Sequence, residues 1–299
     1  MQSRMRVEAI SKKFCIEVAG TMTSSLQAFN RGISEPQKKP TAHARGISKS
    51  GETCFYDAPV SPVVATLSYH KIGNPPSDGW LTWNYISTEE FTAQLEWFQT
   101  RAWDFLSAPA FLDALKGKGS LPTKSILITF DDAYESLLEN AVPVLKRFSA
   151  PAVVFAPTQF VGETNFFDHG VEPLERIADW KTLRALEDAG VSVESHGSSH
   201  RGFSSLSEVE IEQELVFSRQ AIRKNLGKDS RMFAFPYGDC GNDQTAVHSA
   251  ISRAGYDVAF LYGGGVFDPG QTPAPLFLPR LAMGPGVDLD AMLLESSGS

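Results

Sequence analysis

Residues 125–132 read SILITFDD, and this stretch decides the fold of the chain. Its apolar and β-branched run predicts a strand that is buried on both faces, as the strands of parallel sheets are. Two carboxylates, Asp131 and Asp132, follow at once. Adjacent acids in a partly buried place raise each other's pKa unless a cation lies beside them. The stretch therefore predicts a strand of a parallel sheet that ends at a charged site.

A second polar cluster, residues 195–200 (SHGSSH), repeats this arrangement after the strand-like residues 190–194. Neutral imidazole is the commonest side-chain metal ligand, and the cluster offers His196 and His200. Two His and one Asp leave a coordination position open on a tetrahedral ion such as Zn²⁺, as catalytic sites do. Such an ion lowers the pKa of bound water to about 7 and leaves the second Asp as general base. The two clusters together indicate a hydrolytic centre with a divalent metal, for which we expect Zn²⁺.

Each cluster alone has a simpler interpretation. An Asp pair after a strand often caps a helix, and the residues from Ala133 to Arg147 have a helical pattern. A histidine-rich loop is more often solvated than bound to metal. The occurrence of both clusters at strand ends, in a chain that alternates strands and helices, favours the metal site.

The two clusters resemble motifs of the polysaccharide deacetylases with a NodB homology domain, the fourth carbohydrate esterase family. The first motif, Thr-Phe-Asp-Asp, is present at 129–132, and the second, His-Ser/Thr-x-x-His, at 196–200 with Gly197 in place of Ser or Thr. The resemblance extends from about Val60 to the C-terminus. It implies that Asp131 is the general base. It also implies three metal ligands: Asp132, His196 and His200.

The third motif of that family, usually Arg-x-x-Pro-Tyr, matches residues 233–237 (FAFPY), with Phe233 in place of Arg. In the family the backbone N–H of the Tyr helps to bind the oxyanion, and Tyr237 keeps this role because a backbone donor does not depend on the side chain. Arg280 follows another strand-like stretch near the C-terminus. We expect Arg280 to supply the missing guanidinium to Asp131.

The family motif that usually supplies the general acid has no match in this chain. Family members often carry a late Leu-x-His motif, but the only histidine after Tyr237 is His248, within a predicted helix and expected at the surface. His70 ends the strand-like run 63–69 and resembles the Tyr-His pair that begins the exopolysaccharide branch of these deacetylases. We expect His70 in the site as the candidate acid, although a histidine at a strand end can also be hydrogen-bonded packing.

Repeated strand–helix units predict an α/β fold whose parallel sheet carries the site at the carboxyl ends of its strands. The resemblance implies a distorted (β/α)7 TIM-like barrel, the NodB homology domain, over residues 60–299. Residues 1–55 are basic and Ser-rich with little periodicity, and predict a disordered N-terminal extension.

Charge and composition restrict the partners. Residues 1–50 hold nine Lys or Arg against three Asp or Glu, so the rest of a chain at −8 carries −14. This acidic body argues against nucleic acid and polyanionic glycans. The three cysteines, at positions 15, 54 and 240, have no paired spacing. We find no signal-peptide core and no apolar stretch of transmembrane length, so we expect a cytoplasmic protein, or an extracytoplasmic one if translation starts elsewhere.

Two loops hold aromatic candidates for sugar contact, although packing of the loops explains them equally well. These candidates are Trp80, Trp83, Tyr85, Phe160, Phe166, Phe167 and His169. The two polar clusters and the resemblance together predict a metal-dependent deacetylase that removes N-acetyl groups from aminosugar units of an exopolysaccharide or its precursor. Two alternatives stay open: hydrolysis of another amide, such as an N-formyl sugar, and a catalytically silent protein that binds metal and glycan.

Overall fold

The computed structural model describes residues 62–76, 82–271 and 277–296. The predicted disordered extension, residues 1–55, lies outside this part, and a domain start near residue 60 stays a prediction. The strands are β1 (Val63–Tyr69), β2 (Lys71–Ile72), β3 (Tyr85–Ile86), β4 (Asp104–Phe105), β5 (Lys124–Phe130), β6 (Ala152–Ala156), β7 (Val191–Ser195), β8 (Met232–Ala234), β9 (Val258–Phe260) and β10 (Leu281–Ala282). The α-helices are α2 (Thr88–Thr100), α3 (Ala108–Leu115), α4 (Leu137–Arg147), α5 (Trp180–Asp188), α6 (Glu208–Leu226), α7 (Gln244–Ala254) and α8 (Leu289–Ser296). Short 3-10 turns are η1 (Thr158–Phe160), η2 (Phe166–Asp168), η3 (Phe203–Ser205), η4 (Pro236–Gly238) and η5 (Pro269–Gln271).

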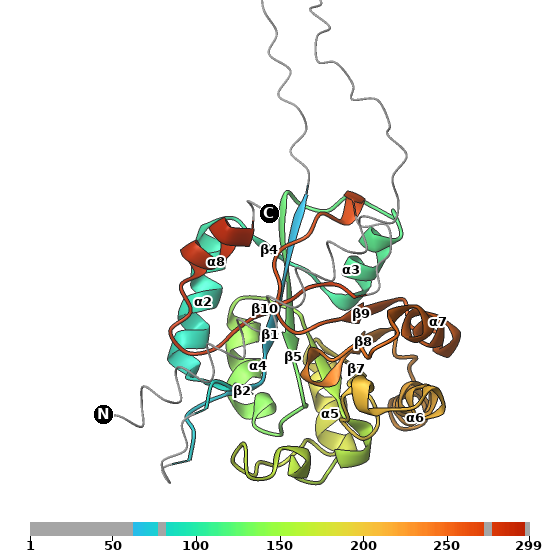
Figure 1. Cartoon of the computed structure of the whole chain (residues 1–299). Helices are drawn as coiled ribbons and strands as arrows, with labels where there is room; N and C mark the ends of the chain where they lie inside the picture. The colour runs from blue at the N-terminus through green and yellow to red at the C-terminus, as the bar shows by residue number, and fades with distance from the viewer. Residues whose placement is uncertain (1–61, 77–81, 272–276, 297–299) are drawn as a thin grey trace, which may run out of the picture. The chain divides into compact units, whose positions relative to one another are not determined.

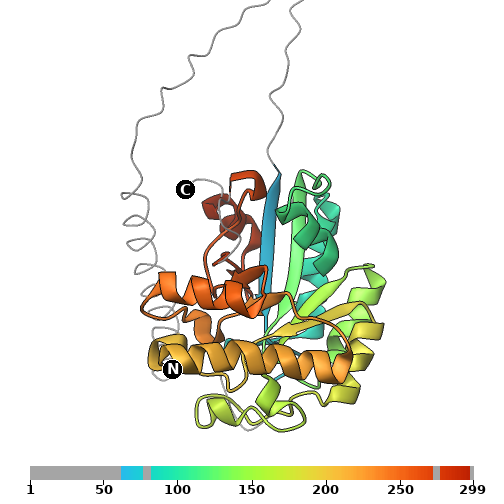
Figure 2. The ribbon, with the colours of Figure 1, turned by 90° about the vertical axis from the view of Figure 1, so that its right-hand side faces the viewer.

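One parallel sheet organises the domain. Its strand order is β10-β1-β5-β6-β7-β8-β9, with β4 paired to β5. Figure 1 shows these strands in the middle of the domain and the helices outside them, and Figure 2 shows α6 and α7 side by side along one flank. The predicted α/β class is confirmed, and strand–helix alternation is its cause because a parallel pair needs a crossover between its strands.

A short segment, residues 278–282, connects the two edges of this sheet. Leu278 pairs with Phe260 of β9, and the N–H of Leu261 donates to the Leu278 carbonyl at 2.9 Å. Three residues later Leu281 pairs with Leu67 of β1. The segment thus curls the sheet into the distorted barrel that was predicted.

Both faces of the strands are buried, as the apolar runs predict. Along β5, Ile126 and Ile128 pack in the cluster beneath α2, α4 and α5, whereas Leu127 points to the opposite face. There it belongs to a second cluster with Phe155 and Phe260. The acidic pair Asp131 and Asp132 comes directly after the last residue of β5, Phe130.

The largest difference from prediction is the start of α4. A helix expected from Ala133 begins only at Leu137. Asp132 and Ala133 have φ values of 67° and 56°, a left-handed conformation that cannot continue into an α-helix. The helix N-cap is Ser136, so the interpretation of the Asp pair as a helix cap is wrong.

Candidate metal centre

Asp131 and Arg280 form a bidentate ion pair in the interior. Arg280 Nη1 and Nη2 donate to Asp131 Oδ1 at 2.7 Å and Oδ2 at 2.8 Å, and Arg280 is completely buried. Arg280 also donates from Nε to the Leu261 carbonyl at 2.7 Å and from Nη1 to Thr129 Oγ1 at 3.1 Å. The hydroxyl of Ser68 donates to Asp131 Oδ2 at 3.3 Å. The structure therefore brings together the two residues that the sequence analysis paired.

The charge state of Asp131 follows from this environment. Burial alone would raise the pKa of the carboxyl group, but the Arg280 guanidinium beside it holds that pKa below its ordinary value. Asp131 is therefore an ionised carboxylate at neutral pH, with fixed orientation.

The three predicted metal ligands converge next to this pair. Asp132, His196 and His200 each offer a ligand atom, and these atoms lie within 4.8 Å of one another. Asp132 Oδ1 is 3.0 Å from His200 Nε2 and 3.5 Å from His196 Nε2. Although these nitrogens are near, Oδ1 accepts no hydrogen bond of regular geometry from any described residue. A buried carboxylate oxygen of this kind, facing two imidazoles, fits a divalent cation with nitrogen and oxygen ligands.

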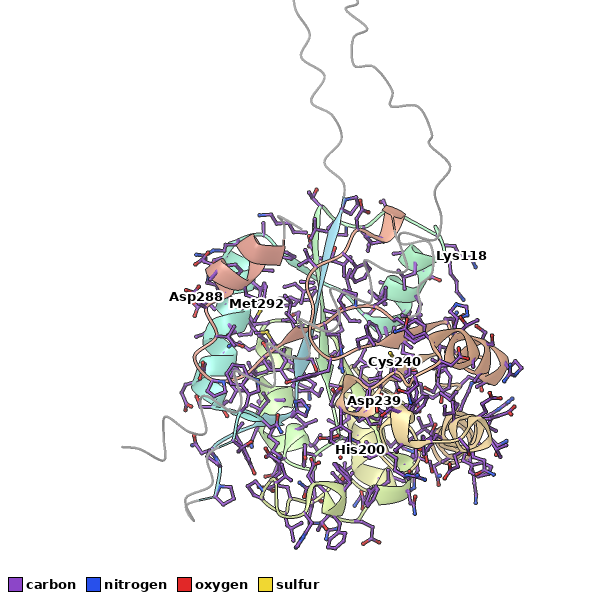
Figure 3. All side chains as sticks on the ribbon, viewed as in Figure 1. Lys118, His200, Asp239, Cys240, Asp288 and Met292 are labelled. Carbon is purple, nitrogen blue, oxygen red and sulfur yellow. The ribbon has the colours of Figure 1, made fainter. Side chains whose placement is uncertain are left out.

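One ring nitrogen of His196 has a backbone partner, which leaves the other nitrogen free as a candidate ligand. Its Nδ1 lies 2.8 Å from the carbonyl oxygen of Ala234 in β8, a contact that assigns the proton to Nδ1. Nε2 then presents its lone pair toward Asp132. Burial lowers the pKa of His196 to about 4, so the ring is neutral at pH 7. Figure 3 labels His200, the other imidazole of the centre.

Unusual backbone conformations gather at this centre. The described residues include seven non-glycine residues with positive φ, and four of them lie in or next to the three motifs. These four are Asp132, Ala133, His200 and Tyr237. Left-handed non-glycine residues are uncommon and concentrate at functional sites, where surrounding structure compensates for their strain. These four positive φ values thus indicate the same site, independently of the chemistry of the side chains.

The two remaining predicted residues, His70 and Tyr237, also lie at the centre. A charge on His70 would lower the pKa of both Asp131 and Asp132, and His70 Nδ1 is buried without a hydrogen-bond partner in the described part of the chain. The Tyr237 ring packs edge-on against His200 with centroids 4.7 Å apart. The structure thus brings all seven predicted site residues to one place, while their roles stay predictions.

Three further residues contact the centre, and the sequence analysis names only one of them, Phe167, as a candidate for sugar contact. Phe167 stacks on His200 with ring centroids 3.9 Å apart. Asp168 accepts a hydrogen bond from the Tyr237 hydroxyl at 3.1 Å, and burial together with the charge of Asp132 raises its pKa. Glu214 contacts the histidine loop from α6. The aromatic loop around Phe167 gave a signal, but the two acids stand outside any motif.

Of the other aromatic candidates for sugar contact, Phe166 is 62% exposed, whereas Tyr85 is buried and donates to Glu175 at 2.5 Å. Trp80 lies outside the described residues. Sugar contact by these side chains stays a prediction.

Residues 118–259 match the family model described as polysaccharide deacetylase. This stretch is a polysaccharide deacetylase domain. A poly-beta-1,6-N-acetyl-D-glucosamine N-deacetylase of Staphylococcus aureus is 33% identical over 187 residues, which are 59% of this chain and 61% of that protein. The corresponding protein of Staphylococcus epidermidis is 31% identical over 188 residues, with the same coverage. The chain thus spans 61% of the length of these relatives.

Solved structures agree on the fold. A Streptococcus pyogenes deacetylase, PplD in complex with acetate, superposes with a TM-score of 0.65 at 19% identity, covering 80% of this chain and 100% of that one. IcaB from Ammonifex degensii gives a TM-score of 0.63 at 23% identity, covering 75% and 93%. In the described ranges of this chain, no helix has both the length and the apolar composition to cross a membrane.

Proposed function

We propose that this chain is a metal-dependent N-deacetylase that hydrolyses N-acetyl groups of an N-acetylglucosamine polysaccharide. The observation that carries this proposal is the buried Asp132, His196 and His200 cluster beside an ionised, Arg280-oriented Asp131. The names of the staphylococcal relatives support the acyl group and the sugar.

The residues divide the reaction among them. Asp132, His196 and His200 would hold the metal, for which their donor set favours Zn²⁺. When bound, such an ion supplies Lewis acidity and lowers the pKa of water. Asp131 takes a proton from the water that adds its oxygen to the acetyl carbon.

Bond cleavage needs a donor on each side of the acyl carbon. The backbone N–H of Tyr237 donates to the carbonyl oxygen as negative charge develops on it. His70, in its protonated form, gives a proton to the departing nitrogen as the carbon–nitrogen bond breaks. The products are acetate and a sugar amine.

The test is release of acetate from β-1,6-linked N-acetylglucosamine oligomers by the zinc-loaded protein. Asp131→Asn and His70→Asn should each lower the rate by about 10²- to 10⁴-fold, because each removes a proton-transfer group. Zinc content should stay at the wild-type level in both. The matched control is His248→Asn on α7, which should keep wild-type activity.

Other outcomes assign the site differently. Formate release from N-formyl oligomers without acetate release would replace the acetyl group by another acyl group. Bound zinc and bound oligomer without either product would identify a silent glycan-binding protein. His70→Asn with wild-type activity would remove His70 as the acid and leave the rest of the proposal standing.

A further inference from the structure

A buried carboxylate on α6 supports the loop that carries both metal-binding histidines. Glu214 is 8% exposed. Its Oε2 accepts hydrogen bonds from the backbone N–H of Ser198 at 2.7 Å and of Ser199 at 2.8 Å. Its Oε1 accepts from the hydroxyl of Ser199 at 2.6 Å. One side chain therefore binds two of the three residues between His196 and His200.

The same loop is held from its other side by backbone bonds. The N–H groups of Thr158 and Gln159 donate to the carbonyl oxygens of Gly197 at 3.1 Å and Ser198 at 2.9 Å. Two carbonyl groups of the loop thus accept from η1, whereas the N–H groups of Ser198 and Ser199 donate to Glu214. The loop belongs to no helix or strand, so its path depends on these bonds together with the bond from the Gly197 N–H to Ser195 Oγ at 3.2 Å.

Gly197 makes room for this carboxylate. A Cβ atom at position 197 would lie 3.0 Å from Glu214 Oε2, and the φ of Gly197 is +77°. Both facts exclude an unstrained side chain at this position. A glycine at position 197, where the second motif usually has Ser or Thr, is therefore compatible with the Glu214 carboxylate beside it.

We propose that Glu214 is a positioning residue of the metal centre. It holds the loop 196–200 so that both imidazoles face Asp132 before an ion arrives, which lowers the conformational cost of binding the ion. Groups that orient metal ligands from outside the coordination shell typically change metal affinity by about 10- to 100-fold. The inference rests on the metal-binding part of the proposed function and is independent of the acyl group.

The test measures metal binding by the metal-free protein rather than activity. The dissociation constant for Zn²⁺ is obtained by competition with a chromophoric chelator, and the visible spectrum of bound Co²⁺ reports ligand geometry. Glu214→Ala should weaken Zn²⁺ binding by about 10- to 100-fold and alter the Co²⁺ spectrum. Glu214→Gln should lie between it and wild type, because its amide oxygen can still accept from both N–H groups.

A control separates positioning from general loss of stability. Ile222→Ala lies on the same helix, eight residues further on, and is completely buried. It should destabilise the fold through a cavity and keep the wild-type Zn²⁺ constant and Co²⁺ spectrum. If Ile222→Ala weakens binding as much as Glu214→Ala does, the proposed role of Glu214 is overturned.

A double variant tests the fit between Gly197 and Glu214. Gly197→Ala should weaken Zn²⁺ binding more in the wild-type background than in Glu214→Ala, where its methyl group no longer meets the carboxylate. Equal effects in both backgrounds would contradict this fit.

The remaining outcomes are also decisive. Wild-type Zn²⁺ and Co²⁺ binding by Glu214→Ala would overturn this inference alone. If Glu214→Ala does not fold, wild-type binding by both Glu214→Gln and Ser199→Ala would overturn it. A wild-type protein that binds neither ion would overturn both this inference and the metal-dependent function, whereas one that binds metal without releasing acetate would overturn only the reaction.

Discussion

At the scale of single residues, the most consequential contact is the buried pair of Asp131 and Arg280. Its two parallel hydrogen bonds match the planar guanidinium to both carboxylate oxygens, a geometry that Lys cannot reproduce. Removing one partner of such a pair leaves an uncompensated charge in the interior. The pair therefore links the orientation of Asp131, the proposed base, to the stability of the fold.

We expect Arg280→Ala to lower the free energy of unfolding by about 3–5 kcal/mol, measured by urea denaturation. The double variant Asp131→Asn/Arg280→Met should recover part of this loss, because it buries no unpaired charge. Arg253→Ala, at an exposed position of α7, serves as control and should change the free energy by less than about 0.5 kcal/mol. A loss below about 1 kcal/mol for Arg280→Ala would contradict the energetic role of the pair.

The sequence allowed the contact of Arg280 with Asp131 to be predicted because Phe233 left a carboxylate without its usual partner. It did not allow Glu214 to be predicted. Glu214 is one of several acids on a long helix, and only the rotation of that helix against the histidine loop selects it. Asp168 lies in a stretch of sequence without periodicity, so its contact with Tyr237 could not be predicted either.

At the scale of elements, α6 begins soon after the histidine loop and has a complete capping box. Glu210 Oε2 accepts from the N–H of Ser207 at 2.9 Å, and Ser207 Oγ accepts from the N–H of Glu210 at 3.4 Å. The Ser-x-x-Glu spacing is visible in the sequence, and α6 starts at Glu208, directly after the N-cap Ser207. Local signals of this kind determine where helices begin.

We expect Ser207→Ala to lower the free energy of unfolding by about 1 kcal/mol, because the first turn loses the hydroxyl that accepts from the N–H of Glu210. The Zn²⁺ dissociation constant should change little, since Glu214 lies beyond the first turn. Ser249→Ala within α7 is the control and should be nearly neutral in urea denaturation. Equal losses for both serines would show that the cap contributes nothing.

The late start of α4 had no such signal. Asp132 and Ala133 adopt left-handed backbone conformations at the candidate metal centre. Residue propensities indicate only a helical pattern for this stretch. Strained backbone at a site is therefore a feature that the sequence does not predict.

At the scale of the whole molecule, a charged cluster ties together α5, β7 and the chain before β8. Lys228 Nζ donates to Glu187 Oε1 at 2.8 Å and to Glu194 Oε1 at 3.2 Å. Burial alone would lower the pKa of Lys228, but the carboxylates of Glu194 and Glu187 raise it above its ordinary value. The lysine charge therefore stabilises the folded state.

A lysine whose pKa is raised by folding contributes fully below its unfolded pKa of about 10.4, and this contribution is lost as pH rises through the folded pKa. We expect wild type to exceed Lys228→Met in free energy of unfolding at pH 9, and this difference to shrink toward pH 12. Urea denaturation at several pH values measures it. A difference that stays constant over this range would show that the charge contributes nothing.

The α/β class was predictable because alternating strands and helices leave few arrangements for a parallel sheet, whereas the barrel was implied by the family resemblance. The closure of the barrel was not predictable. Residues 278–282 pair over such short lengths that their sequence shows no strand pattern.

The position of residues 278–282 near the C-terminus also determines when the buried ion pair can form during synthesis. Arg280 follows Asp131 by 149 residues, and both metal-binding histidines leave the ribosome before it does. A nascent chain that has emerged only as far as Tyr237 holds Asp131 without the Arg280 guanidinium, and its sheet lacks β9 and β10. The buried ion pair and the pairing of Leu281 with β1 can therefore form only after the last strand has been synthesised.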